Sequence, residues 1–557
     1  MNLTPLLWIA CLRVGLVFGA ANFAVPWSST KYGPDGPWQA VKVSVGGVDE
    51  TLRYNLQSTD LDLYPGSRYA SQILVPEACE PHERDGICGK GGKWDITAKS
   101  TMAISWPGSY ENPPMNQTSG ECDFNIQGLT INDITVWNTS LVAVDNVTIT
   151  TAKGITYGPP VGLLALGGDK TVQEFTTSSS RTGALRTYIY PGGLYDQDII
   201  PSYSYTLQIG SAAHDYVGSL VFGGYDKGRI IGPYTTSAET TFRLLDIGIG
   251  VQTGGSPFPF KKKDNLLVTG TSSDDHVTVY PDATLPYMFL PAQTCEEIVK
   301  HLPVEWDSEL SYYLWKTDDP LYKSITSSPA YLSFTFPPAS GAEDNVVIKV
   351  PFALLNLTLE SPITESPKIY FPCYPFSLTE NDDNYHLGRA FLQAAFLGRN
   401  WLSKMTWLAQ APGPGSQLEG LGKQLEDIPD RANTLSYFDP EGQFQRSWEN
   451  YWQPLERDLS PQSPESTPGP PTDDKDDSGL GTGAKVGIAI GAIVGALIIL
   501  GAVFYFKRRS KRPVMGPSHT FTPVEQGKEQ PIQYYGGPAV EIQGSEPTRY
   551  EMDAGTR

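Results

Sequence analysis

The alternation of apolar and polar positions predicts a domain built mainly of β-strands. Between residue 38 and about residue 411, short runs of β-branched and aromatic residues alternate with turns rich in Gly, Pro, Asn and Ser. Residues 41–48 have a strand pattern that runs into a Gly-Gly turn, and residues 294–302 form one of few helical patches. An all-β domain is therefore expected over this range.

Two apolar segments predict a membrane topology. Residues 3–21 have the length and small-residue end of a cleaved secretory signal, although Arg13 interrupts the apolar run. Residues 486–506 carry no charge and are long enough to cross about 30 Å of hydrocarbon as a helix. Because the basic cluster 507–512 follows at once, the positive-inside rule puts the C-terminus in the cytoplasm. We expect a type I protein of the plasma membrane or a secretory-pathway membrane, with its domain extracellular or lumenal.

The segments between and after these elements differ in composition. Residues 412–485 are rich in Pro, Ser and Asp and cannot bury enough apolar surface to order themselves, which predicts a solvated stalk. Within it, residues 444–459 carry Trp448 and Trp452 and could pack back on the domain. The expected order is signal peptide 1–21, ectodomain 27–411, stalk 412–485, transmembrane helix 486–506 and disordered cytoplasmic tail 507–557.

Charge and composition narrow the classes of function. The net charge of −20 argues against a nucleic-acid partner, because such proteins carry basic faces. The six His show no ligand spacing with Cys or acidic residues, so neither a metal site nor a cofactor is expected. Four Asn-X-Ser/Thr triplets on the expected outer side are compatible with glycosylation. They are Asn116, Asn138, Asn146 and Asn356.

Three glycines share one face of the predicted transmembrane helix. Gly487, Gly491 and Gly495 lie four residues apart, a spacing that lets two helices approach closely. Since glycine is common in spanning helices, both a monomer and a homodimer stay open.

Six segments of the β domain resemble the pepsin family of aspartic proteases, in the family's order. They are residues 52–63, 161–167, 200–211, 218–226, 277–291 and 385–392. The resemblance covers about residues 38–411. It implies a mainly β, bilobal pepsin-like fold whose lobes meet near residues 200–230. In such a fold the two lobes enclose a cleft, and each lobe contributes one strand and the loop after it to the floor of that cleft.

The resemblance also implies the positions of the catalytic pair. Asp282, in Tyr-Pro-Asp-Ala-Thr, falls at the second aspartate position, and Asn55 falls at the first. Gln57 and Thr284 fall where the family has loop glycines. Ser58 matches the serine that donates to the outer aspartate oxygen.

An asparagine at the first position bears directly on function. Aspartic proteolysis needs one charged carboxylate to activate water and one protonated carboxyl to polarise the scissile carbonyl. An amide at Asn55 can neither accept the proton of the attacking water nor share a proton with Asp282. We therefore expect an inactive homologue that serves as a surface binding or sensing module for an extracellular peptide or protein. Two alternatives stay open: a membrane-anchored aspartic endopeptidase with an atypical catalytic pair, and a structural glycoprotein near the cell wall.

The cysteines fit a secreted fold. The resemblance implies a disulfide between Cys295 and Cys373 in the second lobe, and Cys79 and Cys88 most simply pair with each other. Cys122 is then left without a partner among these four. It could be a free thiol, form a disulfide with another chain, or exchange partners with Cys79 or Cys88. We favour a buried, inert thiol.

Overall fold

The computed structural model describes residues 19–458 with internal gaps. The gaps are residues 47, 50–53, 56–57, 68, 96–103, 107–109, 113–116, 120–121, 146, 152, 176–184, 270–275, 379–383, 416–422 and 438–440. Most of the predicted signal peptide, the end of the predicted stalk, the segment 486–506 with its three glycines, and the tail lie outside the described residues. Among those described, no helix is both long and apolar enough to cross a membrane.

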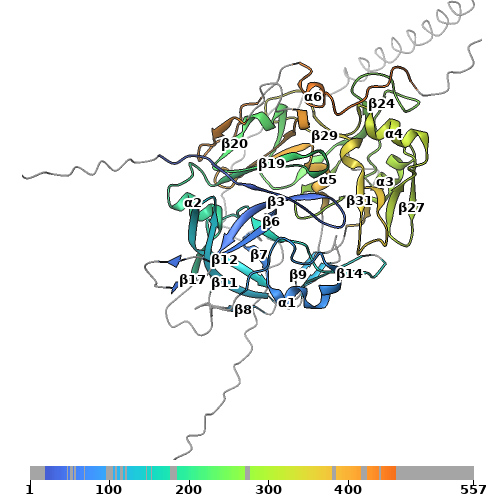
Figure 1. The fold of residues 1–557 in the computed structure, drawn as a ribbon. Helices are drawn as coiled ribbons and strands as arrows, with labels where there is room; N and C mark the ends of the chain where they lie inside the picture. Colours follow the sequence, from blue (N-terminus) through green and yellow to red (C-terminus); the bar gives the residue numbers. More distant parts are fainter. Residues whose placement is uncertain are drawn as a thin grey trace, which may run out of the picture. The chain divides into compact units, whose positions relative to one another are not determined.

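The described chain is mainly β-sheet, as the sequence predicted (Figure 1). We call residues 27–196 the first lobe and residues 242–392 the second lobe. The sheet of the first lobe has the strand order β16-β17-β12-β7-β15-β6-β3-β11-β8 in the described residues, with β2 paired to β3. Its strands are β2 (Trp27–Tyr32), β3 (Trp38–Val45), β6 (Thr59–Ser67), β7 (Ser71–Leu74), β8 (Ile104–Trp106), β11 (Cys122–Ile131), β12 (Ile134–Val144), β15 (Gly162–Ala165), β16 (Val172–Phe175) and β17 (Leu185–Tyr188). Short strands beside it are β4 (Val48–Asp49), β5 (Tyr54–Asn55), β9 (Tyr110–Asn112), β10 (Gln117–Ser119), β13 (Val147–Thr150) and β14 (Thr156–Tyr157).

A sheet between the lobes joins distant parts of the chain. Its order is β1-β19-β18-β35-β36-β21. The strands are β1 (Phe23–Ala24), β18 (Ser204–Ser211), β19 (Tyr216–Phe222), β21 (Ile231–Ser237), β35 (Ala395–Asn400) and β36 (Met405–Gln410). The hairpin β18–β19 lies within residues 200–230, the range in which the sequence predicts that the lobes meet.

The second lobe comprises three further sheets. The first has the order β22-β25-β34-β26-β33, with strands β22 (Phe242–Leu244), β25 (Val277–Pro281), β26 (Met288–Pro291), β33 (Cys373–Phe376) and β34 (Tyr385–Leu387). The second sheet has the order β24-β23-β29-β30, with strands β23 (Asp246–Val251), β24 (Lys262–Lys263), β29 (Ala330–Phe336) and β30 (Val346–Pro351). The third has the order β27-β28-β32-β31, with strands β27 (Val304–Asp307), β28 (Tyr312–Trp315), β31 (Leu357–Leu359) and β32 (Lys368–Phe371). The α-helices are α1 (Pro76–Cys79), α2 (Tyr190–Asp196), α3 (Ala292–Val299), α4 (Pro320–Ser327), α5 (Arg389–Leu392) and α6 (Gln443–Arg446).

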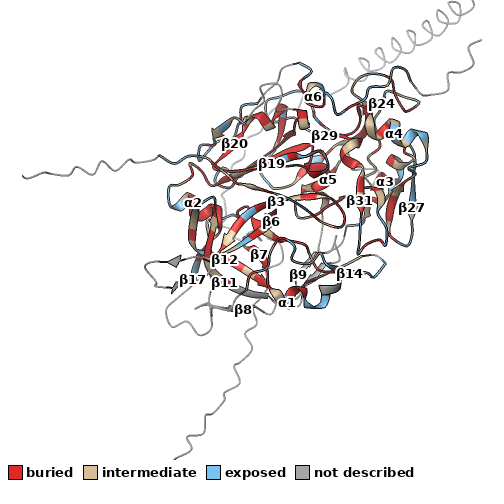
Figure 2. Cartoon of the chain, viewed as in Figure 1, coloured by how far each residue is buried: buried red, intermediate tan, exposed pale blue. Residues whose placement is uncertain are grey.

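Local sequence explains these elements. The fully buried strand β26 reads Met-Phe-Leu-Pro, a continuous apolar run that suits a strand covered on both faces. The predicted helical patch coincides largely with α3, which buries Cys295 and Ile298, three residues apart on one face. Asp319 caps α4 by accepting a hydrogen bond from the Leu321 amide at 2.8 Å. Figure 2 shows that buried residues follow the strands of both lobes.

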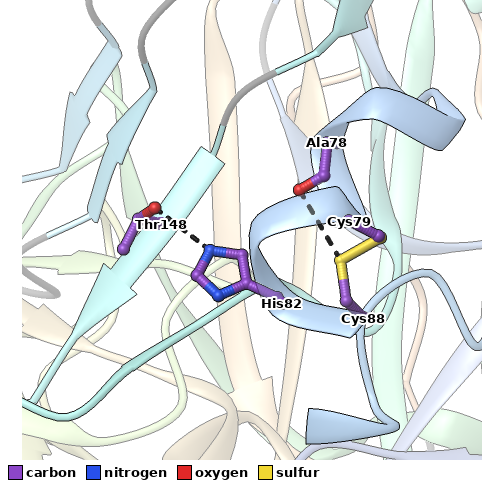
Figure 3. The surroundings of a disulfide bond; sticks show 5 residues. All are labelled: Ala78, Cys79, His82, Cys88 and Thr148. Atoms are coloured by element: carbon purple, nitrogen blue, oxygen red, sulfur yellow. Dashed lines mark hydrogen bonds between the residues drawn. A yellow bond between two sulfur atoms is a disulfide. The ribbon is translucent and has the colours of Figure 1, made fainter. Parts of the chain in front are cut away.

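Both expected disulfides are confirmed. The first-lobe disulfide joins Cys79 and Cys88, and the second-lobe disulfide joins Cys295 and Cys373. Figure 3 shows His82 beside the first of them, 3.1 Å from the hydroxyl of Thr148. Disulfides persist in oxidising compartments, so these bonds indicate folding in the secretory pathway.

The remaining cysteine and the triplet asparagines are only partly described. Cys122 begins β11, but its side chain lies outside the described residues, as do Asn116 and Asn146. Asn138 is exposed on β12, and its amide nitrogen donates to the carbonyl of Arg186 at 2.8 Å. Asn356 is half-buried, and its side-chain oxygen accepts from the hydroxyl of Tyr322 at 3.0 Å.

The folded domain continues past residue 411, where the sequence placed the start of the stalk. Strand β37 (Leu425–Asp427) pairs antiparallel with β20 (Gly224–Asp226). Ile428 and Leu435 are buried beyond it. Trp448 is also buried, so the predicted packing of this region back on the domain is found. These apolar side chains are sparse among polar residues, which is why composition alone assigned the segment to the stalk.

Candidate functional site

Each lobe contains the same three-strand arrangement around a loop. In the second lobe, β34 runs parallel to β25, which precedes the loop, and antiparallel to β26, which follows it. In the first lobe, β15 runs parallel to β6 and antiparallel to β7. The loops after β25 and β6 are therefore structural counterparts.

Strand register identifies the matching residues within the two loops. In the second lobe, Pro281 lies opposite Leu387, and the amide of the next residue, Asp282, donates to the Leu387 carbonyl at 3.0 Å. In the first lobe, Pro65 lies opposite Leu164. The residue that follows Pro65 is Gly66. Beyond Pro65 the register shifts by one residue, so that Ser67 lies opposite Ala165. We take Gly66 as the first-lobe counterpart of Asp282 because it directly follows the Pro65–Leu164 pair, as Asp282 directly follows the Pro281–Leu387 pair. Neither Gly66 nor Ser67 carries a carboxyl.

This register moves the first-loop position from Asn55 to Gly66. Asn55 lies in β5, paired with Val48 of β4, before β6 begins at Thr59. Seven residues at about 3.3 Å each then separate Thr59 from Gly66, which is roughly 23 Å along the strand. Ser58, which is exposed, lies at this same distant end. The side chain of Asn55 and all of Gln57 lie outside the described residues.

A signal for the position given by the register is present in the sequence. A Tyr-Pro dipeptide occurs at residues 64–65 and again at residues 280–281, directly before Gly66 and Asp282. The segment around Asn55 matches the family's first-loop motif at more positions, but it lies at the turn of the long hairpin formed by β3 and β6. An internal repeat between the two lobes would have identified the pair.

Gly66 lies against the second loop. A Cβ atom at this position would lie 3.1 Å from both Cγ2 and the amide nitrogen of Thr284, and 3.3 Å from the carbonyl carbon of Ala283. Its φ of +150° is also one that residues with a side chain rarely adopt. Thr284 therefore occupies the space into which a first-lobe carboxylate would project.

Asp282 is held by its own lobe. The residue is 8% exposed, and its Oδ1 accepts from the amide of Thr284 at 2.9 Å and from the Thr284 hydroxyl at 2.6 Å. Its Oδ2 lies 3.4 Å from Nδ1 of His386. Burial alone would raise the pKa of Asp282, but the interactions with His386 and Thr284 outweigh it and hold the pKa below its usual value.

His386 was not singled out in the sequence as a site residue. It lies on β34, the middle strand of the second-lobe arrangement, and its ring packs edge-on against Tyr280, Phe289 and Phe376 at 5.9 to 6.3 Å between centroids. The main groups that shift the pKa of Asp282 are thus an imidazole and a threonine, and neither is a carboxyl.

Arg389 links the two loops. It is buried at the start of α5, and its Nη1 donates to the carbonyls of Ala283 and Thr284 at 3.1 and 2.9 Å. The guanidinium carbon lies 4.4 Å from the ring centre of Tyr64 and 5.0 Å from that of Trp38, both in the first lobe. A cation stacked on aromatic rings thus ties the second loop to the first lobe.

Asp35 makes a further contact between the lobes. Its carboxylate accepts from Nε1 of Trp38 at 2.8 Å and from the hydroxyl of Tyr287 at 3.3 Å, and its carbonyl accepts from the hydroxyl of Tyr370 at 2.6 Å. Because its carboxylate accepts hydrogen bonds from both lobes, Asp35 has a structural role. In the described ranges, no cluster of three or more His, Cys, Asp or Glu side chains is arranged to hold a metal ion.

Comparison with known proteins gives the family. A sequence model of the eukaryotic aspartyl protease family matches residues 117–411, more than half of the chain. The chain belongs to the eukaryotic aspartyl protease family. The matched range includes the Asp282 loop and starts after Gly66.

One relative in this family is the aspartic proteinase sxa1 of Schizosaccharomyces pombe (strain 972). It is 27% identical over 228 residues, which are 39% of this chain and 38% of that protein. The similarity therefore spans well under half of the relative's length.

Proposed function

We propose that this aspartyl protease family member is a catalytically inactive, membrane-anchored homologue whose outer domain is a surface module that binds or senses a peptide or protein. The observation that carries the proposal is the glycine at position 66, the counterpart of Asp282. The anchor rests on the apolar segment 486–506 and the basic residues that follow it.

The chemistry of the family requires more than one carboxylate. Two neighbouring carboxyls share a proton, so that one acts as base while the other donates to the carbonyl. A glycine at the counterpart position supplies neither function. General acid–base catalysis contributes about 10²–10⁴ in rate, and losing one member of a cooperative pair costs nearly as much as losing both.

The state of Asp282 supports the same conclusion. Its lowered pKa keeps the carboxyl charged over the mildly acidic range, where an aspartic protease would need one of its two carboxyls protonated. Both oxygens are also engaged, Oδ1 by Thr284 and Oδ2 by His386. Asp282 is thus better suited to hold its loop than to activate a water.

Two other functions each have one observation in their favour. Retention of Asp282, together with a relative named as an aspartic proteinase, favours an endopeptidase with an atypical catalytic pair. The exposed Asn138 in a glycosylation triplet favours a structural glycoprotein near the cell wall.

A cleavage assay separates the first of these from the proposal. Full-length protein is incubated with an unfolded protein substrate from about pH 3 to about pH 7, the range over which carboxyl pairs titrate, and the products are analysed by mass spectrometry. We expect no cleavage above that of an Asp282→Asn variant. Cleavage that this substitution abolishes would establish the endopeptidase instead.

A second assay separates binding from a structural role. A labelled library of random decapeptides is equilibrated with wild-type protein and with an Asn138→Gln variant. We expect the wild type and the variant to retain the same peptides uncleaved. Failure of both to retain any peptide would favour the structural glycoprotein.

A further inference from the structure

The last described residues wrap back on the domain. We call residues 443–458 the C-terminal strap; it begins with α6 and ends where the predicted stalk continues toward residues 486–506. Main-chain hydrogen bonds tie it to three separate segments. They run from the amide of Gly415 to the carbonyl of Ser447, from the amide of Gln453 to the carbonyl of Ser327, and from the amide of Gly255 to the carbonyl of Leu455, at 2.9, 2.8 and 2.7 Å.

Aromatic rings fill the inner side of the strap. Trp448 and Trp452 stack with their ring centres 5.3 Å apart, and Phe444 packs edge-on against Trp452 at 5.7 Å. All three rings are buried. Their burial favours the closed strap through the hydrophobic effect.

The same burial leaves donors without acceptors. Within the described part of the chain, the side-chain nitrogens of Gln443, Trp448 and Trp452 have no hydrogen-bond partner. A buried donor without a partner costs free energy that is recovered when water reaches it. The closed strap is therefore less stable than its apolar burial alone indicates.

A histidine from the sheet between the lobes lies under the strap. His214 ends the turn η3 (Ala212–His214) after β18, and its Nδ1 lies 3.1 Å from the hydroxyl of Ser211. Its ring meets the strap at Trp448 and Tyr451, with centroids 5.9 and 6.2 Å away.

The charges around His214 come mainly from its own turn. Burial lowers the pKa of His214 below its usual value, and the neighbouring Asp215 opposes this shift. Asp215 is exposed and is itself paired with Lys31 at 2.7 Å. The strap presents the neutral rings of Trp448 and Tyr451 to the imidazole.

The charged residues of the strap next to this contact are engaged elsewhere or exposed. The guanidinium of Arg446 donates to the carbonyl of Glu441 at 2.7 Å and to the side chain of Gln443 at 2.9 Å. Glu449 is exposed. Neither is among the groups that shift the pKa of His214.

We propose that the C-terminal strap is an acid-sensitive clasp, which opens when His214 takes up a proton and thereby exposes its aromatic rings and lengthens the connection to the stalk. The inference is independent of whether the domain is catalytically active. The rings of Phe444, Trp448 and Trp452 would then become exposed only in acidic surroundings.

The direction follows from proton linkage. In the open state His214 is hydrated and titrates near its usual pKa of about 6.5, whereas in the closed state its pKa is lower. The closed state is thus fully favoured above about pH 6.5 and loses stability as the pH falls below it. If the closed state takes up no proton, the open-to-closed ratio rises about tenfold between pH 7.5 and pH 5.5.

Hydrogen exchange of the full-length protein in detergent tests the clasp. Peptides from residues 443–458 are compared at about pH 7.5 and about pH 5.5, after correction for the intrinsic exchange rate. We expect opening to increase by up to about tenfold at the lower pH. In His214→Phe, which keeps a ring but cannot be protonated, the increase should disappear. Equal protection of the wild-type strap at both pH values, or an unchanged increase in His214→Phe, would overturn the proposal.

A matched control and a second measurement guard against misfolding of the variant. His301 packs edge-on against Phe260 at 5.2 Å, and burial also lowers its pKa, but it lies outside the strap. The variant His301→Phe should therefore keep the wild-type pH response. In the wild type, opening should begin to increase as the pH falls below about 6.5 and should follow the uptake of one proton. An increase that begins only below about pH 4.5 would assign the response to carboxylates and refute a role of His214.

Discussion

A side chain introduced at Gly66 should destabilise the fold, and a smaller residue at position 284 should relieve part of that effect. The Gly66→Ala substitution places a Cβ 3.1 Å from Cγ2 of Thr284 and imposes a φ of +150° on alanine. Backbone strain of this kind costs about 1–3 kcal/mol, and overpacking costs about 1–3 kcal/mol more. We therefore expect a loss of about 2–6 kcal/mol in the free energy of unfolding.

The double-mutant cycle isolates the contact between the loops. Thr284→Ser removes the methyl group but keeps the hydroxyl that donates to Asp282 at 2.6 Å. Alone it should cost about 1 kcal/mol. In Gly66→Ala/Thr284→Ser, the two effects should fall short of their sum by about 1 kcal/mol, since one of the two closest contacts, the one to Cγ2, is gone. Urea unfolding of the full-length chain, followed by tryptophan fluorescence, measures each free energy.

A matched glycine separates backbone strain from packing. Gly154 also has a positive φ, +78°, but a Cβ there would meet nothing within 4 Å. The Gly154→Ala variant should therefore show strain alone, about 1 kcal/mol. Additive effects of Gly66→Ala and Thr284→Ser, or equal costs at Gly66 and Gly154, would refute the packing of Gly66 against the second loop.

The remaining predictions concern bonds around the same loops and the disulfides. Arg389→Lys should lower the free energy of unfolding by about 2–3 kcal/mol in the same urea experiment, because lysine cannot bridge two carbonyls and stack as guanidinium does. The stability contributed by Asp282 should be fully present above about pH 3.9 and lost below it, since its folded pKa is lowered; Asp282→Asn should remove this dependence from acid-unfolding curves. Replacing both cysteines by serine should cost about 4–5 kcal/mol for the second-lobe disulfide, which closes 78 residues, but only about 2–3 kcal/mol for the first-lobe disulfide, which closes 9.

The fold class was predictable because its signals are repeated along the chain. Strand-like runs separated by turn residues indicated the mainly β architecture, and ordered resemblances located the Asp282 loop and the second-lobe disulfide. The sequence could place Asp282 in a loop between two strands because residues 277–291 continue directly into the strand β26 and the helix α3. Local sequence and tertiary position agree there.

The first loop could not be assigned from the local amino-acid sequence. The segment around Asn55 resembles the family's motif, but strand register alone shows that β6 continues as far as Gly66. His386 and Arg389 were missed for a related reason, because their partners are distant in sequence: the carboxylate of Asp282 and the carbonyl of Thr284 lie over 100 residues away. Pairings of this kind depend on tertiary packing.

The most direct test of the central claim measures whether Asp282 has a partner carboxylate. Pepstatin-type inhibitors place a hydroxyl between two carboxylates, and calorimetry on the full-length protein gives their affinity. The account predicts no saturable binding tighter than about 0.1 mM in the wild type, which corresponds to less than about 5.5 kcal/mol of binding free energy. Tight binding that is lost in Asp282→Asn would mean that a second carboxylate lies beside Asp282, and would contradict the assignment of Gly66 to that position.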